Sequence, residues 1–385
     1  MRALTEVADP PGPGLRSERA AHPVRTALLG YLGARAVGVL LLAWWGSHRG
    51  VGGLYRLSSL WDAYWYQQIA AHGYAGTRPV PGPYGPYEPY AFFPAYPLLV
   101  RAAGLVLPLN YAALAVAWAA SLAAAWGIHA VAARLYGDRA GVVAAVLWGV
   151  LPYAVVESAA YSEALFTAFA AWTVHAALRR RWVWAGLLCT CAGLTRPTGL
   201  TLALAVGAAA LLELVRRRDP RALLGAVLAP LGCVGFIAWV GHRKGRWDGY
   251  FRVQDAWQSH FDFGRSTFAS LRRMLVTADT VWLVDVVTAC TLLAAVVLLV
   301  LSAIQRQPPV LLLYSAGMLL LALGDAAYFN SRARFLLPAF GLLYPLATAL
   351  ARTRTRSATV LLLVAAALVS AAYGGYVAFV YPDAP

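Results

Sequence analysis

The chain is a series of long apolar segments separated by short polar connectors. Five segments have the length of a membrane span and at most one charged residue each: residues 27–45, 111–133, 161–178, 281–303 and 358–380. A helix needs about 20 predominantly apolar residues to cross the hydrocarbon core of a bilayer. The pattern therefore predicts an all-α polytopic membrane protein.

Arginines in the connectors indicate how the segments are oriented. Short basic connectors mark the cytoplasmic side, and they are found at Arg16, Arg19 and Arg25, at Arg134 and Arg139, at Arg179 to Arg181, at Arg216 to Arg218 with Arg221, at Arg306, and at Arg352, Arg354 and Arg356. Between these anchors, further helices are expected at residues 140–157, 183–194, 198–215, 222–241, 310–324 and 335–350. The count is about eleven spans, with the N-terminus inside and the C-terminus outside.

Two long connections fall on the outer side, residues 46–110 and 242–280. The first contains an apolar stretch, residues 92–109, that would break the alternation of sides if it spanned. It holds Pro94, Pro97 and Pro108, so an interfacial or re-entrant helix is expected there. Long loops in compact proteins are usually functional, which points to these two segments.

Composition and charge narrow the class of protein. Only 13% of the residues are charged and 60% are hydrophobic, which excludes a water-soluble globule. The net charge of +15 is explained by membrane topology and phosphate contacts, and nucleic acid is not expected as a partner. Residues 1–24, rich in Pro, Gly and Arg, are expected to be a disordered cytoplasmic tail, and residues 25–385 a single transmembrane domain.

No cofactor can be named from the sequence. Cys189, Cys191, Cys233 and Cys290 all lie in apolar segments and are interpreted as core residues. No ligand motif indicates a metal ion, and a divalent cation stays an open alternative.

The acidic residues gather near the outer ends of the expected spans. Seven of the 17 acidic residues lie there: Asp62, Glu88, Glu157, Glu163, Asp279, Asp285 and Asp325. A transporter would tend to place coupling carboxylates at the membrane midplane. The distribution therefore favours an enzyme at the outer surface. Arg35, within the first span, is the main exception and is expected to face the bundle interior.

Residues 58–74 have the pattern of an amphipathic helix lying on the membrane, with Gly73 as its stop. Asp62 and Tyr66 share one face of this helix. Asp62 is a candidate catalytic carboxylate. The alternative is a structural role, because Ser59 and Asp62 have the spacing of a capping box.

The first outer loop resembles the signature of PIG-V-like mannosyltransferases, which are membrane glycosyltransferases of the GT-C type. The matching residues are Trp61, Asp62, Tyr66, Ile69, Ala70, Gly73, Tyr74, Phe92, Phe93, Pro94 and Pro97. Residues 161–172, 192–200 and 331–340 are similar to later blocks of that family. The resemblance implies a GT-C-type bundle, a catalytic Asp in the first outer loop, here Asp62, and a polyprenyl-phosphate sugar as donor.

Sugar transfer from a lipid phosphate needs a base beside the acceptor hydroxyl and cations around the leaving phosphate. Asp62 is the expected base. Arg196, Arg332 and Arg334, at outer turns, are the candidates for binding the donor phosphate, and for each the alternative is a side chain that snorkels to the interface.

Four further residues are candidates for positioning the acceptor or substrate: Trp61, Tyr66, Glu88 and Glu163. Each also has an ordinary explanation. The aromatic residues fit an interfacial belt, Glu88 fits a solvated loop, and Glu163 fits a helix-start acid favoured by the helix dipole.

The expected function is an inverting glycosyltransferase of the bacterial plasma membrane that moves a sugar, mannose by resemblance, from polyprenyl phosphate to an acceptor such as a glycolipid at the outer face. Polyprenyl-phosphate sugar and membrane lipids are the expected partners. A GT-C enzyme that uses another sugar, such as glucose or arabinose, and a lipid or solute transporter are the alternatives.

Overall fold

The computed structural model describes the backbone of residues 13–326 and 328–383, and side chains from His22 onward. The helices of the bundle are α1 (Pro13–His48), α5 (Leu109–Tyr136), α6 (Asp138–Gly149), α8 (Glu163–Leu178), α9 (Trp182–Gly193), α10 (Gly199–Arg217), α11 (Pro220–Leu228), α12 (Leu231–Arg243), α15 (Leu283–Ile304), α16 (Pro309–Gly324), α18 (Tyr344–Ala351) and α19 (Arg356–Phe379). Within the described part, extended structure is limited to two isolated bridges, Val80 with Tyr87 and Phe261 with Asp325.

Short helices connect these elements. They are α2 (Gly53–Ser59), α3 (Asp62–Gly76), α4 (Ala95–Ala103), α7 (Val155–Ser158), α13 (Gly249–Ala256), α14 (Arg265–Arg272) and α17 (Arg332–Phe335), with the single turns η1 (Pro89–Ala91), η2 (Arg273–Thr277), η3 (Phe329–Ser331) and η4 (Phe340–Leu343). A disordered tail was expected over residues 1–24. Residues 1–12 of it lie outside the described residues, and the rest belongs to α1, which begins at Pro13.

The all-helical, multi-span architecture is confirmed, with fewer full-length spans than the eleven expected. By length and apolar character, six helices of the described part can cross a membrane. A seventh forms if residues 329–335 and 340–351, bent by 78°, count as one span. Three further apolar helices, α8, α9 and α16, are shorter. Helices α9 and α16 form close to the expected bounds, but with 12 and 16 residues they are shorter than the roughly 20 residues that a straight span needs.

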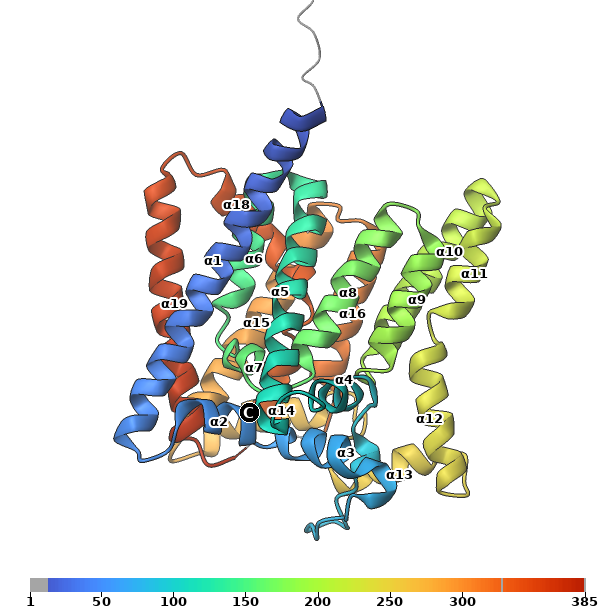
Figure 1. Ribbon diagram of the computed structural model, residues 1–385, viewed down its shortest axis with the longest axis vertical. Helices are drawn as coiled ribbons and strands as arrows, with labels where there is room; N and C mark the ends of the chain where they lie inside the picture. Colours follow the sequence, from blue (N-terminus) through green and yellow to red (C-terminus); the bar gives the residue numbers. More distant parts are fainter. Residues whose placement is uncertain (1–12, 327, 384–385) are drawn as a thin grey trace, which may run out of the picture.

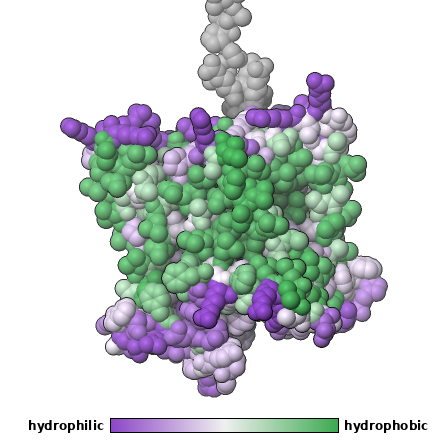
Figure 2. Space-filling view, turned by 180° about the vertical axis from the view of Figure 1, so that it is seen from behind, coloured by the Kyte–Doolittle hydropathy of each residue, from purple (hydrophilic) through white to green (hydrophobic). Residues whose placement is uncertain are grey.

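The short helices lie together at one end of the bundle (Figure 1). Helices α2, α3, α4 and α13 gather at the lower end of this view, and the described chain also ends there, opposite the start of α1. Helix α4 has nine residues, too few to cross a bilayer, so the segment 92–109 does not form a straight span. Figure 2 shows a hydrophobic belt between two hydrophilic rims, as a membrane-spanning bundle requires.

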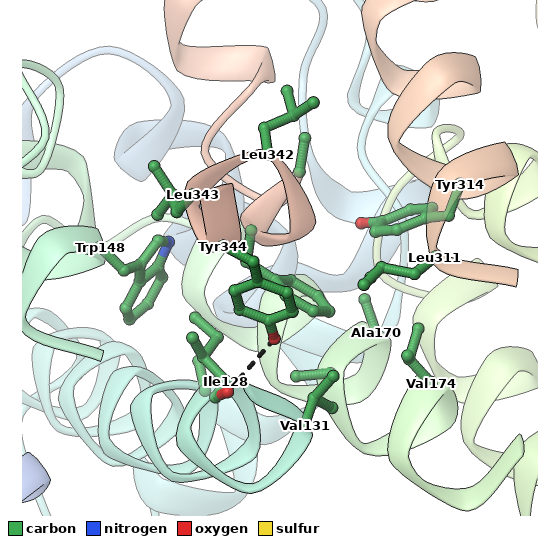
Figure 3. Close-up of a cluster of buried hydrophobic side chains, with 14 of the residues drawn as sticks. Ile128, Val131, Trp148, Ala170, Val174, Leu311, Tyr314, Leu342, Leu343 and Tyr344 are labelled. Carbon is green, nitrogen blue, oxygen red and sulfur yellow. Dashed lines mark hydrogen bonds between the residues drawn. The ribbon is translucent and has the colours of Figure 1, made fainter. Parts of the chain in front are cut away.

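Small residues allow the central helices to pack closely. A Cβ on Gly127 of α5 would lie 2.8 Å from the Cβ of Ala171 in α8. Such close approaches are typical of helix contacts in membranes, where packing rather than water exclusion drives association. Tyr344 Oη donates a hydrogen bond to the carbonyl of Ile128 at 3.2 Å, which joins α18 to α5 inside this core (Figure 3).

Arg35 faces the bundle interior, as expected from the sequence, with 8% of its surface exposed. Its guanidinium donates to Ser158 Oγ from Nε at 3.1 Å and from Nη2 at 2.9 Å. Nη1 donates to the carbonyl of Gly149 at 3.1 Å. The side chain therefore ties α1 to the last residue of α6 and to the last residue of α7, shortly before the segment that carries Glu163.

We expect Arg35→Gln to lower thermal stability by about 1–3 kcal/mol, because buried acceptors lose their charged donor. The measurement is thermal unfolding in detergent. Arg25→Gln is the matched control, since Arg25 is exposed on the same helix. Equal melting temperatures for the two variants would show that the contacts of Arg35 add nothing to stability.

Candidate active site

Asp62 is the first residue of α3, at a sharp corner of the chain. The preceding residue, Trp61, has φ 39° and ψ −107°, a backbone conformation that is rare for a residue with a side chain. One helix was expected over residues 58–74, but α2 ends at Ser59 and α3 begins anew at Asp62. Gly73 interrupts α3 with φ 68°, close to the expected stop. Strained residues of this kind cluster at functional sites.

The capping box considered for Ser59 and Asp62 does not form. Trp61 occupies the position before α3, and no side chain caps the helix start. The carboxylate of Asp62 instead accepts from Arg334, with Oδ2 3.0 Å from Nη1. The carboxylate of Asp62 therefore makes a tertiary contact with Arg334 and does not cap the helix.

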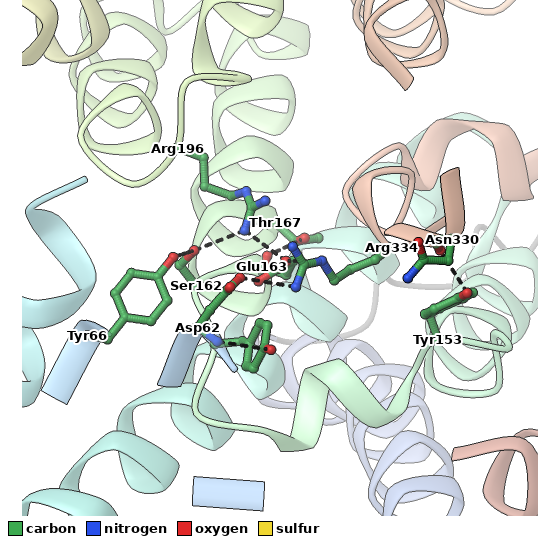
Figure 4. Close-up of polar contacts among 10 residues, drawn as sticks. Asp62, Tyr66, Tyr153, Ser162, Glu163, Thr167, Arg196, Asn330 and Arg334 are labelled. Carbon is green, nitrogen blue, oxygen red and sulfur yellow. Dashed lines mark hydrogen bonds and ion pairs between the residues drawn. The ribbon is translucent and has the colours of Figure 1, made fainter. Parts of the chain in front are cut away.

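Two carboxylates and two guanidiniums alternate in a connected chain (Figure 4). Arg334 joins Asp62 to Glu163, with its Nε 3.3 Å from Glu163 Oε1. Arg196 approaches the same oxygen, with Nη1 at 2.8 Å. In the order Asp62, Arg334, Glu163, Arg196, a guanidinium separates the two carboxylates. We call these four residues the Asp62 cluster.

Four separate elements deliver the cluster. Asp62 begins α3, Glu163 begins α8, Arg334 lies in α17, and Arg196 lies in the connection between α9 and α10. Pro197 follows Arg196 and cannot continue the α9 helix, which leaves the arginine at the turn. The carboxylate of Glu163 lies at a helix N-terminus, where the helix dipole favours negative charge.

Exposure differs across the four members of the cluster. The side chains are 1% exposed for Glu163, 7% for Arg334, 12% for Arg196 and 19% for Asp62. Asp62 is thus the member most open to a substrate, and the buried Glu163 holds both arginines.

The surroundings raise the pKa of Asp62 above its usual value. Burial is the main cause, and the negative charge of Glu163 adds to it. Arg334 and, more weakly, Arg196 oppose the shift by favouring the ionised carboxylate. A carboxylate with a raised pKa is a better proton acceptor near neutral pH than an ordinary aspartate.

Tyr161 and Ser162 complete the site and were not singled out from the sequence as site residues. Ser162 Oγ lies 2.6 Å from Tyr66 Oη and accepts from Arg196 Nη1 at 3.1 Å. The hydroxyl of Tyr161 accepts from the backbone N–H of Asp62 at 3.3 Å, and its ring lies 5.3 Å from the Arg334 guanidinium carbon. Both residues directly precede Glu163 in the sequence, and this proximity to a candidate residue could have identified them.

The expected site residues Arg332 and Glu88 have other partners. Arg332 is fully buried and donates to Thr267 Oγ1 at 2.7 Å and to Ser266 Oγ at 2.8 Å. It thereby fixes the start of α14. Glu88 forms an ion pair with Lys244 and so joins the two long loops. Neither has a contact to the Asp62 cluster among those of the described residues.

Of the two aromatic candidates, only Tyr66 contacts the cluster, through Ser162. Trp61 is half-buried against an apolar group of side chains that includes Tyr66 and Tyr161. Across the part of the chain described, no group of three or more His, Cys, Asp or Glu side chains is arranged to hold a metal ion.

Comparison with known proteins decides the family. A sequence model of glycosyltransferase family 87 matches residues 86–324, well over half of the chain. The chain belongs to glycosyltransferase family 87. The matched region of this family 87 chain contains Glu163 and Arg196, while Asp62 precedes it and Arg334 follows it. A comparison with curated protein sequences finds no match.

Solved structures of GT-C membrane glycosyltransferases share the fold. ArnT from Cupriavidus metallidurans bound to undecaprenyl phosphate has a TM-score of 0.52 at 16% identity over 86% of this chain and 62% of its own. The apo oligosaccharyltransferase of Archaeoglobus fulgidus has a TM-score of 0.54 at 13% identity over 93% of this chain and 58% of its own. The family 87 chain thus spans about three fifths of the length of either protein.

Proposed function

We propose that the chain is an inverting glycosyltransferase that moves a sugar from polyprenyl phosphate to a hydroxyl of an acceptor such as a glycolipid, with Asp62 as the base. The observation that carries the proposal is the Asp62 cluster. Its most exposed member is the carboxylate of Asp62, and the buried Glu163 holds both Arg334 and Arg196. Membership of family 87 supports sugar transfer rather than the transporter alternative. The ArnT structure with undecaprenyl phosphate supports a lipid-phosphate donor.

The reaction is a single displacement. The acceptor oxygen attacks the anomeric carbon as its proton passes to Asp62, and the bond from that carbon to the phosphate oxygen breaks. One displacement inverts the anomeric configuration. Arg196 and Arg334 are proposed to bind the leaving phosphate, because a planar guanidinium matches phosphate oxygens in pairs.

The charge of the cluster supports this division of roles. With Asp62 ionised, two carboxylates balance two guanidiniums. Once Asp62 has taken the acceptor proton, the cluster carries one net positive charge. The phosphate gains one negative charge in the same step, because a diester becomes a monoester. The cluster therefore becomes cationic as the anion develops, which is where electrostatic stabilisation lowers a barrier.

Arg332 is given a different role in this proposal. Its contacts to Ser266 and Thr267 hold the second long loop, so we assign the donor phosphate to Arg196 and Arg334. Two residues are proposed to help position the substrate: Tyr66, which acts through Ser162, and Glu163, which holds Arg196. Trp61 and Glu88 are proposed to shape the loops that surround it.

We place the site and the C-terminus on the outer face of a bacterial plasma membrane, with the N-terminus in the cytoplasm. The arginine-rich connectors at the end of the bundle opposite Asp62 support this orientation. Mannose is the proposed sugar, on the resemblance of the first outer loop to PIG-V-like enzymes. A cell-free assay with radiolabelled polyprenyl-phosphate mannose, glucose and arabinose tests the reaction and the sugar together. Transfer from none of these donors would contradict the proposed function.

We expect Arg196→Ala to raise the KM for the donor about tenfold or more, because a hydrogen bond to a charged group is worth about 1.5–3 kcal/mol. The maximal rate should fall less, since Arg334 still offers a guanidinium to the leaving phosphate. Initial rates over a range of donor concentrations measure both quantities. Arg221→Ala is the control, because Arg221 is exposed at the other end of the bundle. An unchanged donor KM would remove Arg196 from the phosphate site.

A further inference from the structure

A groove between α8 and α9 lies at the end of the bundle opposite the Asp62 cluster. Its cavity of about 210 Å³ is lined by Trp172, His175, Ala176, Arg179, Arg181, Trp184 and Leu188. Trp172 and Ala176 are one turn apart on α8, and Trp184 and Leu188 are one turn apart on α9. The groove therefore runs along two neighbouring helices, with its arginines at the mouth.

The cations at the mouth are available to a ligand. Of the three consecutive arginines 179–181, Arg180 is paired with Glu213, with Nε 3.4 Å from Oε1. Arg179 and Arg181 are exposed, and within the described part neither has a carboxylate partner. His175 lies one turn before Arg179 on α8, and its buried Nδ1 has no hydrogen-bond partner among the described residues. Glu213 is shared between Arg180 and Arg217, so the charges of Arg179 and Arg181 stay without a carboxylate contact in the described part of the chain.

The wall below the arginines is apolar and faces the membrane. Trp184 is 61% exposed and Leu187, beside it on α9, is 42% exposed. Trp126 of α5, 47% exposed, packs edge-on against Trp172 with ring centroids 5.1 Å apart. An indole-lined, lipid-facing wall under two free guanidiniums has the arrangement of a phospholipid, with an anionic phosphate above acyl chains.

We propose that this groove, defined by Arg179, Arg181, His175, Trp184 and Leu188, binds an anionic phospholipid of the leaflet opposite the Asp62 cluster. The phosphate lies between Arg179 and Arg181, and an acyl chain follows Trp184 and Leu188 along α9. Charge selects the ligand, because a zwitterionic lipid brings its own cation to a mouth that is already positive. The lipid-linked donor is a different ligand, since the length of α8 separates Arg179, at the mouth of the groove, from Glu163 by about 24 Å.

The proposal is tested on the purified full chain by lipid retention in native mass spectrometry and by the shift in melting temperature on adding short-chain phosphatidylglycerol. The variant is Arg179→Gln with Arg181→Gln. The control is Arg216→Gln with Arg218→Gln, which removes the same charge from exposed arginines at the end of α10, outside the groove. We expect the first pair to weaken phosphatidylglycerol binding about tenfold or more and the control pair to leave it near wild type.

Two ligand arms distinguish the source of the anion. Phosphatidylcholine of the same chain length and inorganic phosphate should each produce less than a tenth of the shift. Equal loss of binding in the two double variants, or an equal shift with phosphatidylcholine, would overturn the proposal. A shift with inorganic phosphate alone as large as that with phosphatidylglycerol would overturn the assignment to a lipid. The exposure of all four arginines means that the variants fold, which unchanged elution in size-exclusion chromatography verifies.

Discussion

We expect Asp62→Asn to lower sugar transfer by about 10²–10⁴-fold while the protein still folds. The amide has nearly the same shape as the carboxylate but cannot accept the acceptor proton, and a positioned general base contributes about 10²–10⁴-fold to rate. The loss should appear in the maximal rate at saturating donor, measured in the cell-free assay. Asp62→Glu should recover part of the activity, because it restores a carboxylate one methylene further out.

The control for this change is Asp255→Asn. Asp255 lies in the second long loop and is 54% exposed, and among the described residues its carboxylate contacts Arg252 alone. It therefore reports the effect of losing an outer carboxylate without loss of the base. Full activity in Asp62→Asn would remove the proposed mechanism.

Replacing Arg334 by methionine should reduce both activity and stability. The guanidinium is the link between Asp62 and Glu163, so its removal leaves two carboxylates facing one another in a largely buried site. Breaking a buried ion pair by deleting one partner costs about 3–5 kcal/mol of stability. Loss of a donor aimed at the leaving phosphate should lower the maximal rate by about 10²–10³-fold.

Two further variants separate the structural effect of Arg334 from its chemical effect. Arg334→Lys keeps the charge and loses the planar fork, so we expect intermediate activity with most of the stability retained. Arg334→Met with Glu163→Gln removes both the cation and its buried partner, and should recover stability without recovering activity. Thermal unfolding and initial rates are measured on the same preparations. Wild-type turnover in Arg334→Met would contradict a role for this arginine at the phosphate.

The spacing of apolar residues predicted most of the helices, but it did not predict where the helices break or bend. The expected spans are helical, but the sequence does not show that the surface helix breaks at Trp61 or that the chain bends between α17 and η4. Both features depend on tertiary contacts, such as the ion pair that draws Asp62 toward Arg334. Local propensity carries no information about a partner 272 residues away.

The site shows the same division. Asp62 was identified by the resemblance of its surroundings, not by its spacing, which equally allowed a helix cap. Arg332 and Arg334 were equivalent candidates, yet residues two apart on a helix point about 160° apart. Only one of them can therefore face Asp62, and helical geometry alone already made this choice necessary. The pairing of Glu88 with Lys244 depended on how two long loops meet, which no sequence pattern revealed.

The pH dependence of kcat/KM tests the central claim, that Asp62 is a base whose pKa is raised by its burial and further by the charge of Glu163. Activity requires the ionised carboxylate, so it should fall as the pH drops through a pKa above that of an ordinary aspartate. In Glu163→Gln the negative charge that raises this pKa is gone, and the acidic limb should move to lower pH even if the maximum is reduced. An acidic limb that stays in place in Glu163→Gln would contradict the account.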